Sequence, residues 1–135
     1  MRAVLDTNVL ISMVLNPDGP FSLAWDAWRS GGFQVAVCNE LLDEVQDVLA
    51  RPKISKRLNN ENKADLISLL KHHTLMFKIT KPYPKFEDED DRFLLALLEE
   101  SSADVLVTGD AALESLNNFA GTLIIKPKVF LEALS

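Results

Sequence analysis

Residues 3–10 read AVLDTNVL, an apolar run that ends at Asp6 and passes directly into a helical pattern. Residues 105–110 read VLVTGD and repeat the arrangement, with Asp110 just past the run. Short apolar strands separated by helices indicate a parallel sheet covered on both faces. In such sheets ligands bind beyond the carboxyl ends of the strands. We therefore expect Asp6 and Asp110 to lie near a ligand site.

The rest of the chain keeps this alternation. Strands are expected at residues 2–6, 33–37, 75–79, 105–108 and 122–125. Helices are expected at residues 9–15, 21–30, 40–50, 53–73 with a break near 59–60, 91–101, 112–117 and 127–134. Right-handed crossovers make a doubly wound α/β sandwich the natural topology. We expect one domain over residues 1–135, since no linker divides the chain.

Composition narrows the class of protein. The chain has 135 residues, 47% of them hydrophobic, a net charge of −6 and one cysteine. No signal peptide and no membrane-spanning segment are expected, so we expect a cytoplasmic protein and no membrane partner. A net negative charge argues against a general polyanion binder. That objection weakens if the acids hold cations.

Four carboxylates stand at positions where α/β folds place chemistry: Asp6, Glu44, Asp91 and Asp110. Gathered together, they would need divalent cations to stay ionised. Each also has a simpler interpretation. Asp6 could cap the helix that follows it, although Asn8 could do so instead. Glu44 could be a surface side chain at the edge of an apolar stripe, Asp91 part of a solvated acidic run, and Asp110 a turn residue.

Two charged segments remain open. Residues 87–91 read EDEDD, and spacing does not decide whether Asp90 or Asp91 faces inward; Asp88 is a plausible auxiliary. Residues 51–57 carry four basic side chains, namely Arg51, Lys53, Lys56 and Arg57. They are either a solvated helix end or a contact for nucleic acid.

Together these motifs resemble the PIN-domain ribonuclease family, in particular its VapC-like toxins of prokaryotes. The matching segments are LDTNVL at 5–10, LLDEV at 41–45, DDRFLLA at 90–96 and VTGD at 107–110. The resemblance covers nearly the whole chain. It implies a three-layer α/β/α sandwich with a short-stranded, mainly parallel sheet.

The resemblance also implies an activity, the Mg²⁺- or Mn²⁺-dependent cleavage of single-stranded RNA. The family's acidic quartet maps to Asp6, Glu44, Asp91 and Asp110, and its polar residues to Asn8 and Thr108. Asp88 or Asp90 could share the role of Asp91. Many members are inhibited by an antitoxin protein, so we expect such a partner beside the RNA substrate, and a homodimer is left open.

Two other functions compete with a ribonuclease. A signalling receiver domain is also a small doubly wound fold with a Mg²⁺ site, and residues 125–127, IKP, resemble the end of its last strand. It needs an acid after the third strand, where this chain has Thr80-Lys81-Pro82. The other rival is a catalytically silent PIN scaffold that binds RNA or protein, against which the complete quartet argues.

Overall fold

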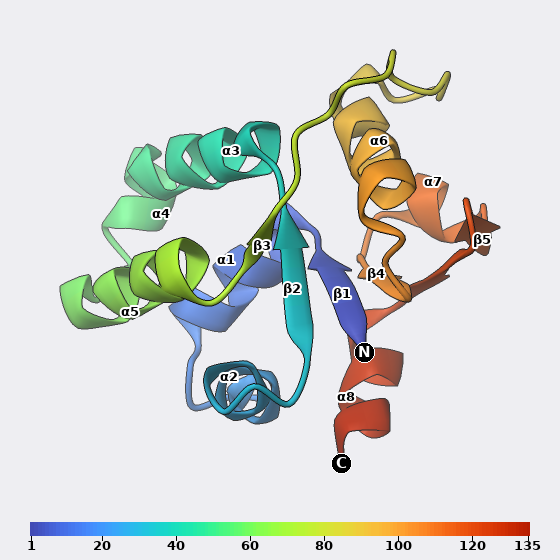
Figure 1. The fold of residues 1–135 in the computed structure, drawn as a ribbon. Coiled ribbons are helices and arrows are strands. Elements are labelled where there is room, and N and C mark those ends of the chain that lie inside the picture. The colour runs from blue at the N-terminus through green and yellow to red at the C-terminus, as the bar shows by residue number, and fades with distance from the viewer.

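The computed structural model describes residues 1–135, and its elements follow the expected alternation (Figure 1). The strands are β1 (Arg2–Leu5), β2 (Gln34–Val37), β3 (Leu75–Met76), β4 (Val105–Val107), β5 (Asn118–Phe119) and β6 (Thr122–Ile125). The helices are α1 (Thr7–Leu15), α2 (Ser22–Arg29), α3 (Asn39–Ala50), α4 (Pro52–Ser55), α5 (Asn60–His72), α6 (Arg92–Ser101), α7 (Ala111–Glu114) and α8 (Pro127–Leu134). A 3₁₀ turn, η1 (Glu89–Asp91), precedes α6.

The six strands form one sheet in the order β3-β2-β1-β4-β6-β5. All neighbours are parallel except β5 and β6. The chain moves from β1 outward to β2 and β3, and then returns to place β4 on the other side of β1. The strand order therefore reverses between β1 and β4. In a doubly wound sheet this is where a ligand crevice forms, at the carboxyl ends of the strands.

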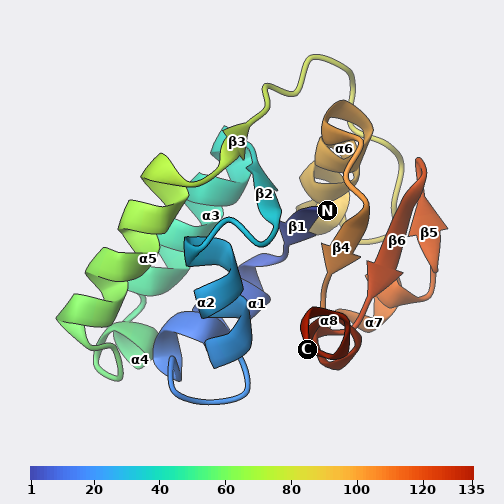
Figure 2. The same cartoon turned by 60° about the horizontal axis from the view of Figure 1, so that its bottom comes forward.

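Helices cover both faces of the sheet. Figures 1 and 2 show α1, α3 and α5 on one side and α6 and α7 on the other, which confirms the three-layer arrangement. The apolar side chains of β1, β2 and β4 are buried between these layers. Strands buried on both faces read as continuous apolar runs, which is why the sequence showed them clearly.

Two local features differ from the prediction. The third strand ends at Met76 instead of Ile79, because only Phe77 continues the backbone pairing with β2. The last strand has an antiparallel partner, β5, which the sequence did not predict. The turn between β5 and β6 uses Ala120 and Gly121, both with positive φ (52° and 83°). Alanine rarely adopts such a φ, so the sequence carried no usual turn signal there.

No helix of the structure has both the length and the apolar character needed to cross a membrane.

Candidate active site

Asp6 lies at the carboxyl end of β1, directly before α1. Its backbone takes the N-cap position of α1, but its side chain makes no capping hydrogen bond. Asn8 does not cap the helix either, since it is the second residue of α1 and is exposed. The Asp6 side chain is only 5% exposed, and burial raises its pKa. A hydrogen bond from Thr108 opposes this rise in pKa, whereas the charges of Glu44 and Asp110 add to it.

Thr108 connects the acids that follow β1 and β4. Its hydroxyl donates to Asp6 Oδ2 at 2.7 Å and accepts from the backbone N–H of Asp110 at 3.0 Å. The strand register makes this contact, because Leu5 pairs with Val107 across the centre of the sheet. The side chain is fully buried. Thr108 therefore fixes the position of one carboxylate relative to the backbone of another.

Asp110 is both a helix cap and a member of an acidic group. Its Oδ1 accepts from the backbone N–H groups of Ala112 (2.8 Å) and Leu113 (3.3 Å), which caps α7. Its Oδ2 accepts no hydrogen bond within the chain. The capping role expected of a turn acid therefore uses one oxygen and leaves the other for a ligand.

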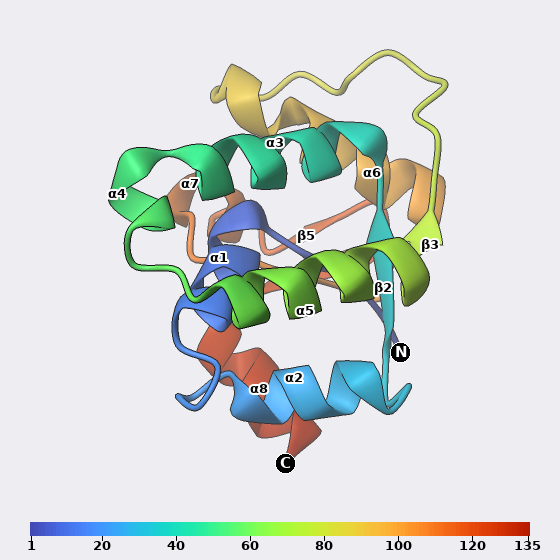
Figure 3. The ribbon, with the colours of Figure 1, turned by 90° about the vertical axis from the view of Figure 1, so that its left-hand side faces the viewer.

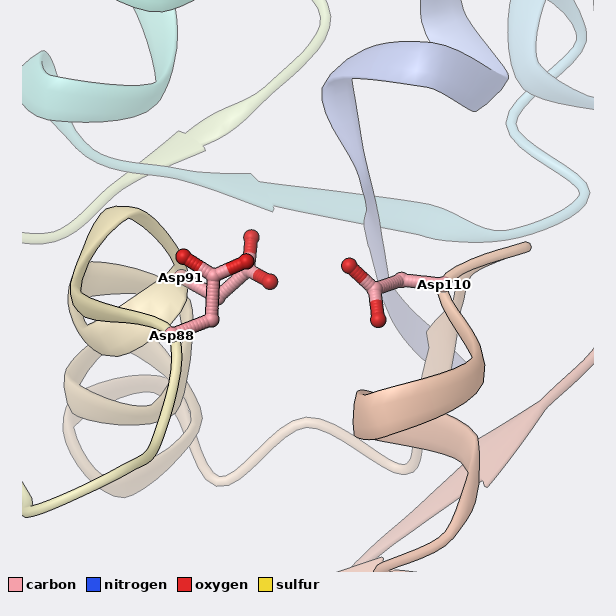
Figure 4. Close-up of side chains that lie close together, drawn as sticks. All are labelled: Asp88, Asp91 and Asp110. Carbon is pink, nitrogen blue, oxygen red and sulfur yellow. The ribbon is translucent and has the colours of Figure 1, made fainter.

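Asp88, Asp91 and Asp110 form the tightest group of carboxylates. Each contributes an oxygen, and these oxygens lie within 4.8 Å of one another. Figure 4 shows Asp88 and Asp91 pointing from the η1 segment toward Asp110. Asp91 Oδ2 is buried and has no hydrogen-bond partner. Burial raises the pKa of Asp91 to about 8, and Asp110 and Asp6 contribute to the rise.

The structure thus separates the members of the acidic run at residues 87–91. Asp91 is half-buried and faces Asp110, whereas Asp90 is exposed. Asp88 caps the 3₁₀ turn by accepting from the N–H of Asp90 through Oδ1 at 3.0 Å. This 3₁₀ turn brings Asp88 and Asp91 to the same side.

Glu44 lies on α3 across a cleft from η1. It is half-buried and is not part of the three-carboxylate group, but its charge reaches Asp6. The cleft has a volume of about 640 Å³. It is lined mainly by acids from α3 and η1, including Glu40, Asp43, Asp47 and Asp90, with Asn8 on its wall. The helical pattern did not predict that the other acids of α3 would also face this cleft.

The basic residues 51–57 begin at one end of the cleft. Arg51 lines it and is the only basic side chain that does so. Lys53 lies on α4, and Lys56 and Arg57 follow that short helix; all are exposed. The two salt bridges of the structure lie elsewhere, at Arg29–Asp65 and Lys126–Glu114. The cluster is therefore free of acidic partners.

The carboxylates fit a divalent cation. Oxygen ligands of this kind are preferred by Mg²⁺ and Mn²⁺. Asp91 Oδ2 is buried without a hydrogen-bond partner, and the pKa of Asp91 is raised. Both features are expected of clustered carboxylates that have no positive charge between them. Asp88, Asp91 and Asp110 could hold such an ion, with Asp6 and Glu44 beside them.

An acidic group that could hold a cation, at the switch point of a parallel sheet, is typical of a class of α/β proteins that includes metal-dependent nucleases. The PIN domain family model matches residues 2–112 of this chain. The chain belongs to the PIN-domain family. PIN domains are generally nucleases that carry metal-binding acidic residues.

Individual proteins are similar to this chain in sequence or in fold. An uncharacterised protein of Methanocaldococcus jannaschii, MJ1680, is 31% identical over 121 residues, which are 87% of this chain and 76% of that protein. The crystal structure of VapBC2 from Rickettsia felis, bound to a DNA fragment of its promoter, has a similar fold. Its TM-score is 0.59 at 11% identity, over 93% of this chain and 98% of the other. PAE2754 from Pyrobaculum aerophilum gives a TM-score of 0.56 at 14% identity, over 99% and 98%.

Proposed function

We propose that this protein is a metal-dependent endoribonuclease that hydrolyses phosphodiester bonds of single-stranded RNA. The observation that carries the proposal is the convergence of Asp88, Asp91 and Asp110 within 4.8 Å, beside the buried Asp6. Carboxylates in such proximity repel one another unless a proton or a cation lies between them. In a PIN domain a cation is the natural occupant, and a nuclease is the natural activity.

In this proposal Asp6, Glu44, Asp91 and Asp110 are the catalytic and metal-binding residues, with Asn8, Asp88, Asp90 and Thr108 as auxiliaries. Asp91 and Asp110 would hold Mg²⁺ or Mn²⁺ together with Asp88. When bound, the cation supplies activation of water and neutralisation of the phosphate. Thr108 keeps the Asp6 carboxylate oriented toward the group, and the cap on α7 does the same for Asp110. No side chain of the cleft is an evident nucleophile, so water is the attacking group.

The substrate would enter along the cleft between α3 and η1. Its phosphates would be repelled by the acids of α3, so the basic cluster of residues 51–57 is needed at the end of the cleft. Single-stranded RNA fits a groove better than a duplex, because its backbone can bend and its bases are free to make contacts.

We further propose that the protein is the toxin of a toxin–antitoxin pair. The fold it shares with VapBC2 supports this assignment, and VapBC2 is a complex of two proteins. The partner would be an antitoxin that controls the ribonuclease. A receiver-like signalling domain receives no such support, since the chain belongs to the PIN-domain family.

The experiment that tests the function is a cleavage assay on a panel of single-stranded and structured RNAs. Purified protein is incubated with Mg²⁺, Mn²⁺ or a chelator. We expect cleavage of single-stranded segments with either metal and none with the chelator. Asp110→Asn should abolish cleavage while keeping the α7 cap, because asparagine also caps helices. Asp26→Asn, at an exposed position away from the acidic group, serves as the control.

A silent PIN scaffold predicts a different result. It would bind RNA without cleaving it in any metal, and Asp110→Asn would then change nothing except metal affinity. Cleavage that persists in Asp110→Asn at the wild-type rate would point to a contaminating nuclease and would remove the support for the proposal.

A further inference from the structure

Tyr83 is the only aromatic side chain of the chain that is exposed, at 38%. The tryptophans are buried, and the phenylalanines are buried or half-buried. Tyr83 lies in the segment of residues 77–88 that joins β3 to η1. Figure 3 shows this segment crossing above α3 on its way to α6.

Tyr83 is held by one hydrogen bond to its side chain and by others to its backbone and that of Pro84. Its hydroxyl donates to Glu40 Oε2 at 2.7 Å. Its backbone carbonyl accepts from Arg92 Nη2 at 3.0 Å, and the carbonyl of Pro84 accepts from Arg92 Nε at 2.8 Å. Prolines precede and follow it, and they restrict the backbone. Ordering this side chain on a ligand would therefore cost little entropy.

Tyr83 is not one of the residues that line the cleft, but its hydroxyl binds one that is. Its hydrogen-bond partner, Glu40, lines the cleft at the first turn of α3, and Arg51 lines it just beyond the last turn. Eleven residues of α-helix span about 16 Å. The cleft therefore runs along α3 with an aromatic ring near one end and a cation at the other.

The electrostatics of this end favour an uncharged, flat ligand group. Glu40 and the acids beside it repel phosphate. A nucleobase carries no charge and offers a π-face. A tyrosine phenol is neutral at ordinary pH and so does not add to the repulsion; the hydrogen bond to Glu40 raises the pKa of Tyr83 further, to about 12.

We propose that Tyr83 is the platform on which one nucleobase of the RNA stacks, at the end of the cleft opposite Arg51. This inference rests on the proposed function, because it names a contact of the same substrate. The bases of single-stranded RNA commonly stack on aromatic side chains in this way. Because every base has a π-face, the platform gives affinity and register with only modest sequence preference.

The test is a binding series on short fluorescent single-stranded RNAs, followed by anisotropy with Ca²⁺ as the divalent ion. One RNA is intact, and the others each carry a single abasic position. We expect Tyr83→Ala to weaken binding of the intact RNA by roughly 5- to 150-fold, the range of one lost base stack. At one abasic position, wild type and Tyr83→Ala should bind equally, since no base is left to stack.

Further variants separate the ring from the hydroxyl. Tyr83→Phe keeps the ring and loses the bond to Glu40, and it should bind like wild type. Tyr83→Leu keeps apolar bulk without the π-face and should weaken binding as Tyr83→Ala does. It tests the inference even if the alanine variant is unstable. Met76→Ala removes another exposed apolar side chain, on β3, and should have no effect. Thermal melts of each variant report folding.

Three outcomes would overturn the inference. Tyr83→Ala could bind intact RNA as wild type does. Its loss could be the same for intact RNA and for every abasic RNA. Tyr83→Phe could lose as much as Tyr83→Ala, which would make Tyr83 a latch that holds the segment to α3. A failure of the proposed function looks different: wild type would then not cleave RNA with Mn²⁺, whatever Tyr83 does.

Discussion

The hydroxyl of Thr108 links the two acids that follow β1 and β4, Asp6 and Asp110. It donates to one carboxylate and accepts from the backbone of the other, and it is fully buried. Removing it leaves a buried carboxylate oxygen and a backbone N–H without partners. Such a loss costs about 1–3 kcal/mol for a buried group, and of these two only the Asp6 contact is fully buried.

We therefore predict that Thr108→Val, which keeps the shape of the side chain, lowers the free energy of unfolding by about 1–3 kcal/mol. Urea denaturation in the presence of a chelator measures it. Thr108→Ser restores the hydroxyl and should recover most of the loss, apart from the missing methyl group. Equal stability of the valine and wild-type proteins would mean that the hydrogen bond contributes nothing net.

Asp91 predicts a pH dependence. Its pKa is raised from an ordinary 3.8 to about 8 in the folded protein, first by burial and then by Asp110. Between these values the unfolded chain has released the proton while the folded chain still holds it. The free energy of unfolding of the metal-free protein should therefore fall as pH rises from about 4 to about 8. Above about pH 8 the contribution of Asp91 to this fall should level off.

The measurement is a set of denaturation curves across that pH range in chelator, for wild type and Asp91→Asn. The variant has no titrating group at this position, so its stability should fall less steeply with pH. Parallel curves for the two proteins would show that the Asp91 carboxyl titrates normally, and that a different group dominates the acidic cluster.

Among the secondary-structure elements, the sequence predicted the buried strands and the amphipathic helices. The runs at residues 2–6, 33–37 and 105–108 are apolar because both faces of β1, β2 and β4 are covered. The helix break predicted near residues 59–60 is confirmed, and Asn59 caps α5 there by accepting from the backbone N–H groups of Glu61 and Asn62 through its side chain. These features are local, so a local pattern reveals them.

Other features depend on contacts that no local pattern contains. Asp88 was expected only as an auxiliary, and it joins the carboxylate group because the 3₁₀ turn that it caps brings it to the same side as Asp91. Tyr83 meets Glu40 across 43 residues of chain. Glu40 itself faces the cleft because η1 lies opposite α3. The sequence offered one hint, an aromatic residue between two prolines in a loop.

The short helix α4 allows a prediction about the basic cluster. Lys53, Lys56 and Arg57 are exposed and have no acidic partner. If they contact phosphates, replacing all three by alanine should weaken RNA binding evenly across sequences. It should also flatten the dependence of log affinity on log salt by roughly 0.7 for each lost contact. Anisotropy titrations at several salt concentrations give both values.

A charge-matched control distinguishes local contacts with phosphates from a general effect of the net charge. Lys71 lies on α5, and Lys126 and Lys128 lie at the start of α8; none of them lines the cleft, and Lys126 is paired with Glu114. Their replacement by alanine changes the net charge by the same amount and should leave the salt slope nearly unchanged. Equal slopes in the two triple variants would make residues 51–57 a solvated helix end.

The whole molecule is expected to be stabilised by the cation that its acids favour. A ligand that binds only the folded state at ~100 times its dissociation constant adds roughly 2.7 kcal/mol. A domain of this size should then melt several degrees higher in saturating Mn²⁺ than in chelator, since about 1 kcal/mol corresponds to about 2–8 °C. Differential scanning fluorimetry records the shift. Asp110→Asn should melt higher than wild type in chelator, because repulsion is relieved, and should respond less to Mn²⁺.

The bond from Thr108 to Asp6 closes a span of 102 residues, and the strand that carries Thr108 enters the sheet beside the first strand of the chain. A ribosome releases residues in order, so Asp6 emerges long before its partner exists. Between those two moments Glu44, Asp88 and Asp91 also emerge, but the hydroxyl that binds the Asp6 carboxylate does not yet exist. A site built this way cannot form until nearly all of the domain that carries it has left the exit tunnel.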